Sequence, residues 1–183
     1  MKLPDGIDYS KYNQTSGMST KHWGPSYWMF LFSSVMGVYP IKVDWNNSDH
    51  IFLVNEFRST ILSLISILPC IFCRESLNFF VSELPIDKFL DGRIEMMYWL
   101  YLIKNKVNNK LIRQEKMMLV KQKQEISQMH YPGTNSYNEA IEKCYNDTFM
   151  TVPSPNFESV LDYYESLRAV CSKDAKKCII KRS

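Results

Sequence analysis

The sequence lacks a long uninterrupted apolar run. Its most apolar stretch, residues 51–69, is broken by Asn55, Glu56 and Arg58, whereas a helix that spans a bilayer needs about 20 mainly apolar residues. The start of the chain, MKLPDGIDYS, also lacks the apolar core of a signal peptide. We therefore expect a soluble, intracellular protein that does not insert into membranes.

A strong charge of one sign is absent as well. The chain has 22 Lys and Arg against 19 Asp and Glu, a net charge of +3. No basic run alternates with aromatic residues, as a groove for single-stranded nucleic acid requires, so we expect no nucleic-acid partner. The five cysteines form neither a dense disulfide pattern nor a recognisable series of zinc ligands, and we assign no residue to a metal.

The alternation of apolar and polar residues that is typical of strands does not persist anywhere, whereas helical periodicity recurs along most of the chain. The predicted helices lie at 23–39, 48–68 with Ser48 as cap, 70–84, from a cap at Asp91 through 111, 136–147 and 156–170. The fourth is expected to continue through residues 113–128 as a solvated extension. We predict an all-α protein with a flexible N-terminal segment at 1–20, a four-helix bundle at 21–118 and a helical C-terminal extension at 119–183.

Two cysteines, Cys70 and Cys73, directly follow Pro69 at the predicted start of a helix. At this spacing both side chains lie on one face, roughly 5–6 Å apart at Cβ, so a disulfide can close with little movement. The N–H groups of the first turn also stabilise a thiolate. Three interpretations are open: a redox pair, half of a zinc site that needs about two more ligands, or two thiols packed like small apolar residues.

Three motifs occur in order along the chain: WGPSYW at 23–28, LPCIFC at 68–73 and KNKVNNKL at 104–111. In order and spacing they resemble the Erv/ALR sulfhydryl oxidases over residues 20–115, most closely those of large cytoplasmic DNA viruses. The resemblance implies a helical bundle that holds FAD beside the C-x-x-C, oxidises protein dithiols and reduces O2 to H2O2. It also implies a homodimer, a thioredoxin-like viral carrier among the substrates, and a location in the host cytoplasm or the virion.

The resemblance further implies roles for individual residues. Cys70 corresponds to the outer sulfur, which exchanges with the substrate, and Cys73 to the inner sulfur, which reacts with the flavin. The residues implied in FAD binding lie on two predicted helices: Trp23, Gly24, Trp28, Phe32, Lys104, Asn105, Val107, Asn108, Lys110 and Leu111. Phe32 and Lys104 stand where the family usually carries histidine, so we expect the packing around the adenine and the ring to differ.

The residues of the third motif are compatible with this role. Lys104, Asn105 and Asn108 share one flank of a predicted helix beside its apolar stripe, which suits a ligand with an apolar ring and a polar tail. Trp28 offers a flat apolar wall. The alternative is that Trp28 belongs to the core and that the third motif is an ordinary solvated face.

The remaining cysteines lie beyond the bundle. Cys171 and Cys178 bracket a short basic segment, CSKDAKKC, and family members often carry a second, mobile pair that passes electrons to the C-x-x-C. A shuttle and a structural clamp are both open for this pair, and Cys144 has no evident partner. For the whole chain, the alternative to an oxidase is a non-enzymatic helical adaptor or a zinc-binding module that retains the fold.

Overall fold

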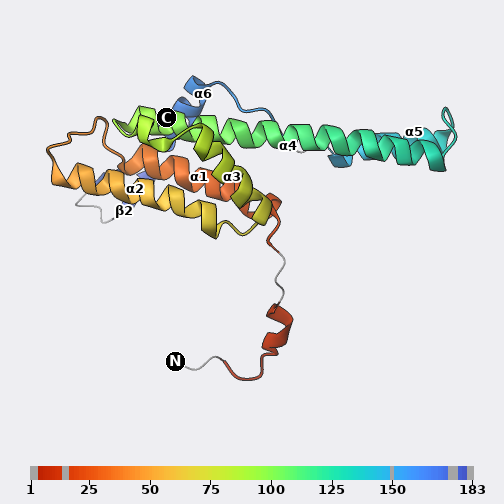
Figure 1. The fold of residues 1–183 in the computed structure, drawn as a ribbon, viewed down its shortest axis with the longest axis horizontal. Helices are drawn as coiled ribbons and strands as arrows, with labels where there is room; N and C mark the ends of the chain where they lie inside the picture. The colour runs from red at the N-terminus through yellow and green to blue at the C-terminus, as the bar shows by residue number, and fades with distance from the viewer. Residues whose placement is uncertain (1–3, 14–16, 149–150, 173–176, 181–183) are drawn as a thin grey trace.

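The computed structural model describes residues 4–13, 17–148, 151–172 and 177–180, with side chains up to residue 169. Within these residues it contains six α-helices, two short 3-10 helices and one pair of strands (Figure 1). In chain order the elements are η1 Tyr9–Tyr12, α1 Thr20–Val38, α2 Ser48–Ile67, α3 Ile71–Glu83, η2 Ile86–Phe89, α4 Arg93–Met129, α5 Asn135–Thr148, α6 Phe157–Ser166, β1 Ala169–Ser172 and β2 Lys177–Ile180. The predicted all-α class is confirmed.

Helices α1 to α4 form a bundle around large apolar side chains. α1 packs against α4, and α2 packs against α3 (Figure 1). Phe32, Tyr39 and Trp99 are almost completely buried. The polar atoms of the last two are satisfied, because Tyr39 Oη donates to the carbonyl of Leu90 at 2.8 Å and Trp99 Nε1 donates to that of Leu84 at 2.9 Å. These aromatic side chains therefore contribute their full apolar area without leaving a polar atom unpaired.

The cap of α2 lies one residue earlier than predicted. Asn47, rather than Ser48, is the N-cap, and its Oδ1 accepts hydrogen bonds from the N–H groups of Asp49 and His50. Both residue types are good caps. Because the Asn47 side chain accepts from these N–H groups, Asn47 is the cap and Ser48 is the first helical residue.

The cap of α4 also differs from the prediction. The N-cap is Gly92, not Asp91, and a Cβ at this position would lie 2.7 Å from the carbonyl oxygen of Ile41. Asp91 instead accepts a hydrogen bond from Trp45 Nε1 at 3.2 Å. A contact between distant parts of the chain thus replaces the local cap.

The second half of α4 projects far from the bundle, and α5 folds back along it (Figure 1). We call this helical hairpin, residues 115–148, the arm. Its turn contains Gly133 at φ 86°, a conformation that favours glycine. Leu119, Cys144 and Thr148 are buried in the arm. The extension of α4 is therefore covered on one side, which corrects the expectation of a solvated helix.

α6 packs onto the bundle, a contact that the sequence did not predict. It contacts α1 and α4, and its Val160 and Tyr164 belong to the main core. The Tyr164 ring stacks on Phe32, with the ring centroids 5.0 Å apart and the planes inclined by 17°. The bundle is therefore completed by a helix from the C-terminal part of the chain.

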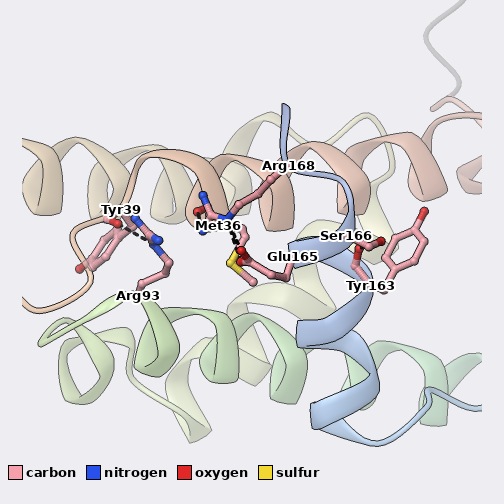
Figure 2. Close-up of polar contacts among 7 residues, drawn as sticks. All are labelled: Met36, Tyr39, Arg93, Tyr163, Glu165, Ser166 and Arg168. Atoms are coloured by element: carbon pink, nitrogen blue, oxygen red, sulfur yellow. Dashed lines mark hydrogen bonds and ion pairs between the residues drawn. The ribbon is translucent and has the colours of Figure 1, made fainter. Parts of the chain in front are cut away.

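The end of α6 is attached to the end of α1 (Figure 2). Arg168 Nη2 donates to the carbonyl of Met36 at 3.0 Å, while its Nε pairs with Glu165 at 2.7 Å. Arg93 Nε donates to the carbonyl of Tyr39 at 2.9 Å nearby. Carbonyl groups in the last turn of a helix have no partner within that helix, so these two guanidinium groups satisfy the end of α1.

The predicted helix at 156–170 ends early, at Ser166. After a turn, β1 pairs antiparallel with β2, and the register sets Cys171 directly opposite Cys178. This strand pair was not predicted. Strands of four residues each are too short to show a clear alternation in the sequence.

Candidate active site

Cys70 and Cys73 lie where α2 gives way to α3. Cys70 is the N-cap of α3, in an extended conformation at φ −124° and ψ 124°. Its carbonyl oxygen accepts hydrogen bonds from the N–H groups of Cys73 and Arg74, both at 3.1 Å. Both thiols are free and half-buried. The predicted position of the pair, in the first turn of a helix after Pro69, is confirmed.

The loop before the pair is held by two contacts. Arg74 Nη1 donates to the carbonyl of Leu68 at 2.6 Å. From the N-terminal side, Met18 N–H donates to the carbonyl of Pro69 at 3.0 Å. Gly17 approaches so closely that a Cβ on it would lie 2.5 Å from the same oxygen. The peptide that enters the C-x-x-C is thus fixed from two sides.

The surroundings of Cys70 favour its thiolate. Burial opposes ionisation, but the neighbouring Cys73 thiol, the N–H groups of Cys73 and Phe72 and the charge of Lys110 outweigh it, so the pKa of the Cys70 thiol lies below its ordinary value. Neither N–H group makes a fully aligned hydrogen bond to the sulfur. They act through their dipoles at the helix N-terminus.

Cys73 has the opposite tendency. Burial, the shared hydrogen bond with Cys70 and the negative charge of the Cys70 thiolate raise the pKa of Cys73 to about 12, against the weaker influence of Lys110 and Arg74. The pair therefore ionises at Cys70 first, while Cys73 keeps its proton. A thiolate is the reactive form in thiol–disulfide exchange, so Cys70 has the better environment of the two for a nucleophile.

Lys110 joins α4 to α3 beside the two thiols. Its Nζ donates to Ser76 Oγ, and its positive charge lowers the pKa of Cys70 and of Cys73. Lys110 also borders an open cleft of about 360 Å³, whose other lining residues are Glu75, Ser76, Phe79, Phe80 and Arg113. Of the predicted cofactor residues on α4, Lys110 is thus the one that acts on the C-x-x-C.

The other predicted residues of α4 are half-buried. Lys104 has a lowered pKa because of burial, and it forms no ion pair with any described side chain. Asn105 Oδ1 is buried without a hydrogen-bond partner among the described residues. Asn108 Nδ2 donates to Ser154 Oγ at 2.7 Å. Val107 and Leu111 are half-buried beside them.

The predicted residues of α1 fall into two groups. Phe32 is buried under Tyr164 and lies 6.2 Å from Trp28, measured between ring centroids. Trp23, Gly24 and Trp28 are half-buried, and Trp23 Nε1 donates to the carbonyl of Met18 at 3.2 Å. The indole of Trp23 is therefore tied to the same N-terminal segment that touches Pro69.

A strap formed by residues 151–156 crosses α4 on its way to α6. Thr151 Oγ1 donates to Glu115 at 2.6 Å, Ser154 Oγ accepts from Asn108, and the carbonyl of Pro155 accepts from Tyr101 Oη at 3.0 Å. From the sequence, this segment is only the gap between the predicted helices at 136–147 and 156–170. No local pattern could reveal these contacts, because each joins residues more than 35 positions apart.

The α4 flank fits the group that the resemblance implies. An amide oxygen buried without a partner costs free energy unless a donor is supplied, and the flavin ring carries such an N–H donor. A half-buried ammonium without a counter-ion suits a phosphate. Asn105 and Lys104 would therefore hold FAD, with Trp28 as an apolar wall. The amide of Asn108 is already occupied by the strap.

The second cysteine pair is placed by its backbone alone. Residues directly opposite in an antiparallel ladder have Cβ atoms about 4.5–5.5 Å apart, and Cys171 and Cys178 occupy such positions. Their side chains lie outside the described residues, so the choice between shuttle and clamp stays open. Cys144 is buried in the arm and donates to Gln122 Oε1 at 3.3 Å.

The sequence matches no protein-family model and no curated protein. Within the described ranges, no helix combines the length and apolar character needed to cross a membrane. The side chains described up to residue 169 also contain no group of three or more His, Cys, Asp or Glu able to hold a metal ion.

Proposed function

We propose that this protein is a flavin-dependent thiol oxidase of the Erv/ALR type, with Cys70 and Cys73 as its redox pair. The observation that carries the proposal is the asymmetry of the two thiols. Cys70 has a lowered pKa at the start of a helix, whereas Cys73 is more deeply buried and has a raised pKa. One sulfur is thus suited to exchange with a protein, and the other to face the interior.

The exchange begins from the oxidised pair. A substrate thiolate attacks Cys70 Sγ, the bond between Cys70 and Cys73 breaks, and Cys73 leaves as a thiolate. Two of the three causes that raise the pKa of Cys73 come from Cys70, and they disappear once the Cys70 sulfur is bonded to the substrate, so Cys73 becomes a better leaving group at this step. A second substrate thiolate then attacks the substrate sulfur of the mixed disulfide, and Cys70 leaves.

Cys70 suits this last step, because a thiol of low pKa is a good leaving group. The substrate has gained a disulfide, and its two electrons now reside on the Cys70–Cys73 dithiol. Bound FAD would accept these electrons and pass them to O2, which gives H2O2. Asn105 and Lys104 would bind the cofactor, and Trp28 would shield the ring from water. The homodimer and the protein dithiol substrates belong to the same proposal.

The test is the colour and the oxygen consumption of the purified protein. We expect an oxidised-flavin spectrum and O2 consumption with dithiothreitol. Cys70→Ser and Cys73→Ser should each abolish turnover while retaining flavin and helicity, and Cys144→Ser, a matched control, should not. A colourless protein that gains neither flavin nor activity after incubation with FAD would overturn the proposal. A zinc ion bound at Cys70 and Cys73 would replace it with the zinc-binding alternative.

A further inference from the structure

Residues next to Cys70 carry large exposed apolar side chains, which we call the rim. The rim consists of Met18, Ile67, Ile71 and Phe72, which are exposed by 65%, 66%, 54% and 68%. Exposure alone does not single them out, because scattered apolar side chains are normal on protein surfaces. Their position beside the cysteines singles them out. Ile71 and Phe72 lie between the two cysteines in the sequence, and the Met18 N–H donates a hydrogen bond to the carbonyl of Pro69.

Two of the rim residues, Ile71 and Phe72, lie on α3 but point away from the core that this helix contacts. α3 buries Leu77 and Phe80 against the core, so Ile71 and Phe72 occupy its other side. The solvated side of a surface helix is normally polar, and an apolar group of this kind is typical of an interaction site. From residue 64 to 74 the chain has no acidic side chain. This stretch is therefore mainly apolar, and Arg74 is its one charged side chain. The cations that act on the thiols are Lys110, for both, and Arg74, for Cys73 alone.

We propose that the rim is the docking surface for the substrate polypeptide, and that the oxidase prefers cysteines flanked by apolar residues. The inference rests on the proposed function of the same site. In a disulfide the two Cα atoms are about 5.5–6 Å apart, and each further residue of an extended chain adds about 3.3 Å. The neighbours of a substrate cysteine bonded to Cys70 therefore come within reach of Ile71 and Phe72.

The structure already contains a main chain at this place. Gly17 approaches the Pro69–Cys70 peptide so closely that a Cβ would lie 2.5 Å from the carbonyl oxygen of Pro69 and 3.3 Å from the Cα of Cys70. A main chain can therefore lie directly against the peptide that enters the C-x-x-C, and the occupant that we infer for the rim is a polypeptide. Its apolar side chains would cover Ile71 and Phe72 when its cysteine reaches Cys70.

The experiment measures exchange at Cys70 without the flavin. The full-length Cys73→Ser protein, with Cys171→Ser and Cys178→Ser, is mixed with either of two synthetic peptides whose single cysteine is disulfide-bonded to thionitrobenzoate. In one peptide Leu and Phe flank the cysteine, and in the other Ser and Asn do. The Cys70 thiolate attacks the peptide sulfur, the existing disulfide breaks, and coloured thionitrobenzoate leaves.

We expect the apolar peptide to react roughly 5- to 10-fold faster, as partial burial of two side chains predicts. Adding Ile71→Ser and Phe72→Ser should remove the preference. Phe52→Ser, the matched control, should retain it, because Phe52 is 63% exposed but lies about 22 Å along α2 from Ile67. Equal rates for the two peptides, or an equal loss in Phe52→Ser, would overturn the proposal.

Light scattering tests whether the rim is instead covered by a second copy of the chain. If the rim variant changes from dimer to monomer but keeps the peptide preference, the rim is a contact between copies and the proposal is wrong. Oxygen consumption with dithiothreitol is measured separately on the flavin-loaded wild type. If the flavin-loaded protein consumes no oxygen, the proposed oxidase function is wrong. If it consumes oxygen but shows no peptide preference, only the proposal that the rim binds the substrate is wrong.

Discussion

Cys70 and Cys144 have opposite surroundings, and they lie in two different parts of the molecule. Cys70 is half-exposed at the start of α3, beside N–H groups and the charge of Lys110. Cys144 is buried in the arm, where its thiol donates to the neutral oxygen of Gln122. The reactivity of a cysteine depends on its exposure and on nearby charges. We therefore expect Cys70, in the bundle, to react readily and Cys144, in the arm, to react slowly.

The two regions are also held together differently. The bundle buries several of its largest side chains almost completely, among them Phe32, Tyr39 and Trp99. The arm buries Leu119, Cys144 and Thr148 and depends on polar contacts between α4 and α5. Local stability follows the amount of buried apolar area. The arm should therefore open more easily than the bundle, and Cys144 reports that opening.

The largest effect should come from the core of the bundle. Trp99→Ala removes a side chain that is 1% exposed and hydrogen-bonded to Leu84, and such changes cost about 3–5 kcal/mol of unfolding free energy. We expect this loss in urea unfolding followed by circular dichroism. Tyr98→Ala, next in the chain but 41% exposed, should cost far less. Equal losses would mean that the bundle does not depend on this core.

The next effect should be confined to the arm. Gln122 Oε1 accepts from Cys144 Sγ at 3.3 Å and from Thr148 Oγ1 at 3.0 Å, so Gln122→Ala should cost about 1–2 kcal/mol there. We expect iodoacetamide to modify Cys144 roughly tenfold faster, as measured by mass spectrometry of its peptide. The control is Gln124→Ala, at an exposed position of the same helix. If the urea midpoint of the bundle shifts equally, the two regions open together.

The sequence predicted the helices of the bundle well, because their apolar periodicity is a local property. The end of α2 and both ends of α3 agree with the prediction within one residue. The predicted caps of α2 and α4 were wrong. Asn47 caps α2 in place of Ser48, and Asp91 accepts a hydrogen bond from Trp45 instead of capping α4. Local patterns cannot rank such competing contacts.

The candidate site was predictable only in part for the same reason. Cys70 and Cys73 were identified from their spacing. The stacking of Tyr164 on Phe32 and the contact of Ser154 with Asn108 depend on how α6 returns to the bundle. Periodicity predicts that a segment is helical, but not which face of the molecule it will cover.

Asn105 provides a test in which the sign of the effect depends on the cofactor. Its Oδ1 is buried without a partner among the described residues, so Asn105→Leu should leave the flavin-free protein equally or more stable. In the flavin-loaded protein the same change should weaken retention by about 1–2 kcal/mol, roughly tenfold. Thermal unfolding and flavin release on dilution measure the two effects.

Asn109→Leu serves as the matched control for this test, because Asn109 is exposed on the same helix. It should change flavin retention little. If Asn105→Leu destabilises the flavin-free protein and leaves retention unchanged, the amide serves the fold rather than the cofactor, and the cofactor site must lie elsewhere on the bundle.

The smallest effect concerns the charge on Cys70. The thiolate fraction rises as pH rises through the pKa, and the pKa of Cys70 is lowered, against the opposing effect of burial, by the Cys73 thiol, the first-turn N–H groups and Lys110. Alkylation of Cys70 should therefore reach half its maximal rate at a lower pH than an ordinary cysteine. Lys110→Gln removes a positive charge, which raises the pKa and moves this midpoint upward. Lys104→Gln, on the same helix, should leave the midpoint of Cys70 alkylation unchanged.

Stopped-flow alkylation with identification of the modified peptide measures both midpoints. Cys73, with its pKa raised to about 12, should react more slowly than Cys70 as long as Cys70 is unmodified. If the Lys104 and Lys110 variants shift the midpoint equally, the effect reflects net charge, and the contrast between Cys70 and Cys144 rests on exposure rather than on the cation beside the pair.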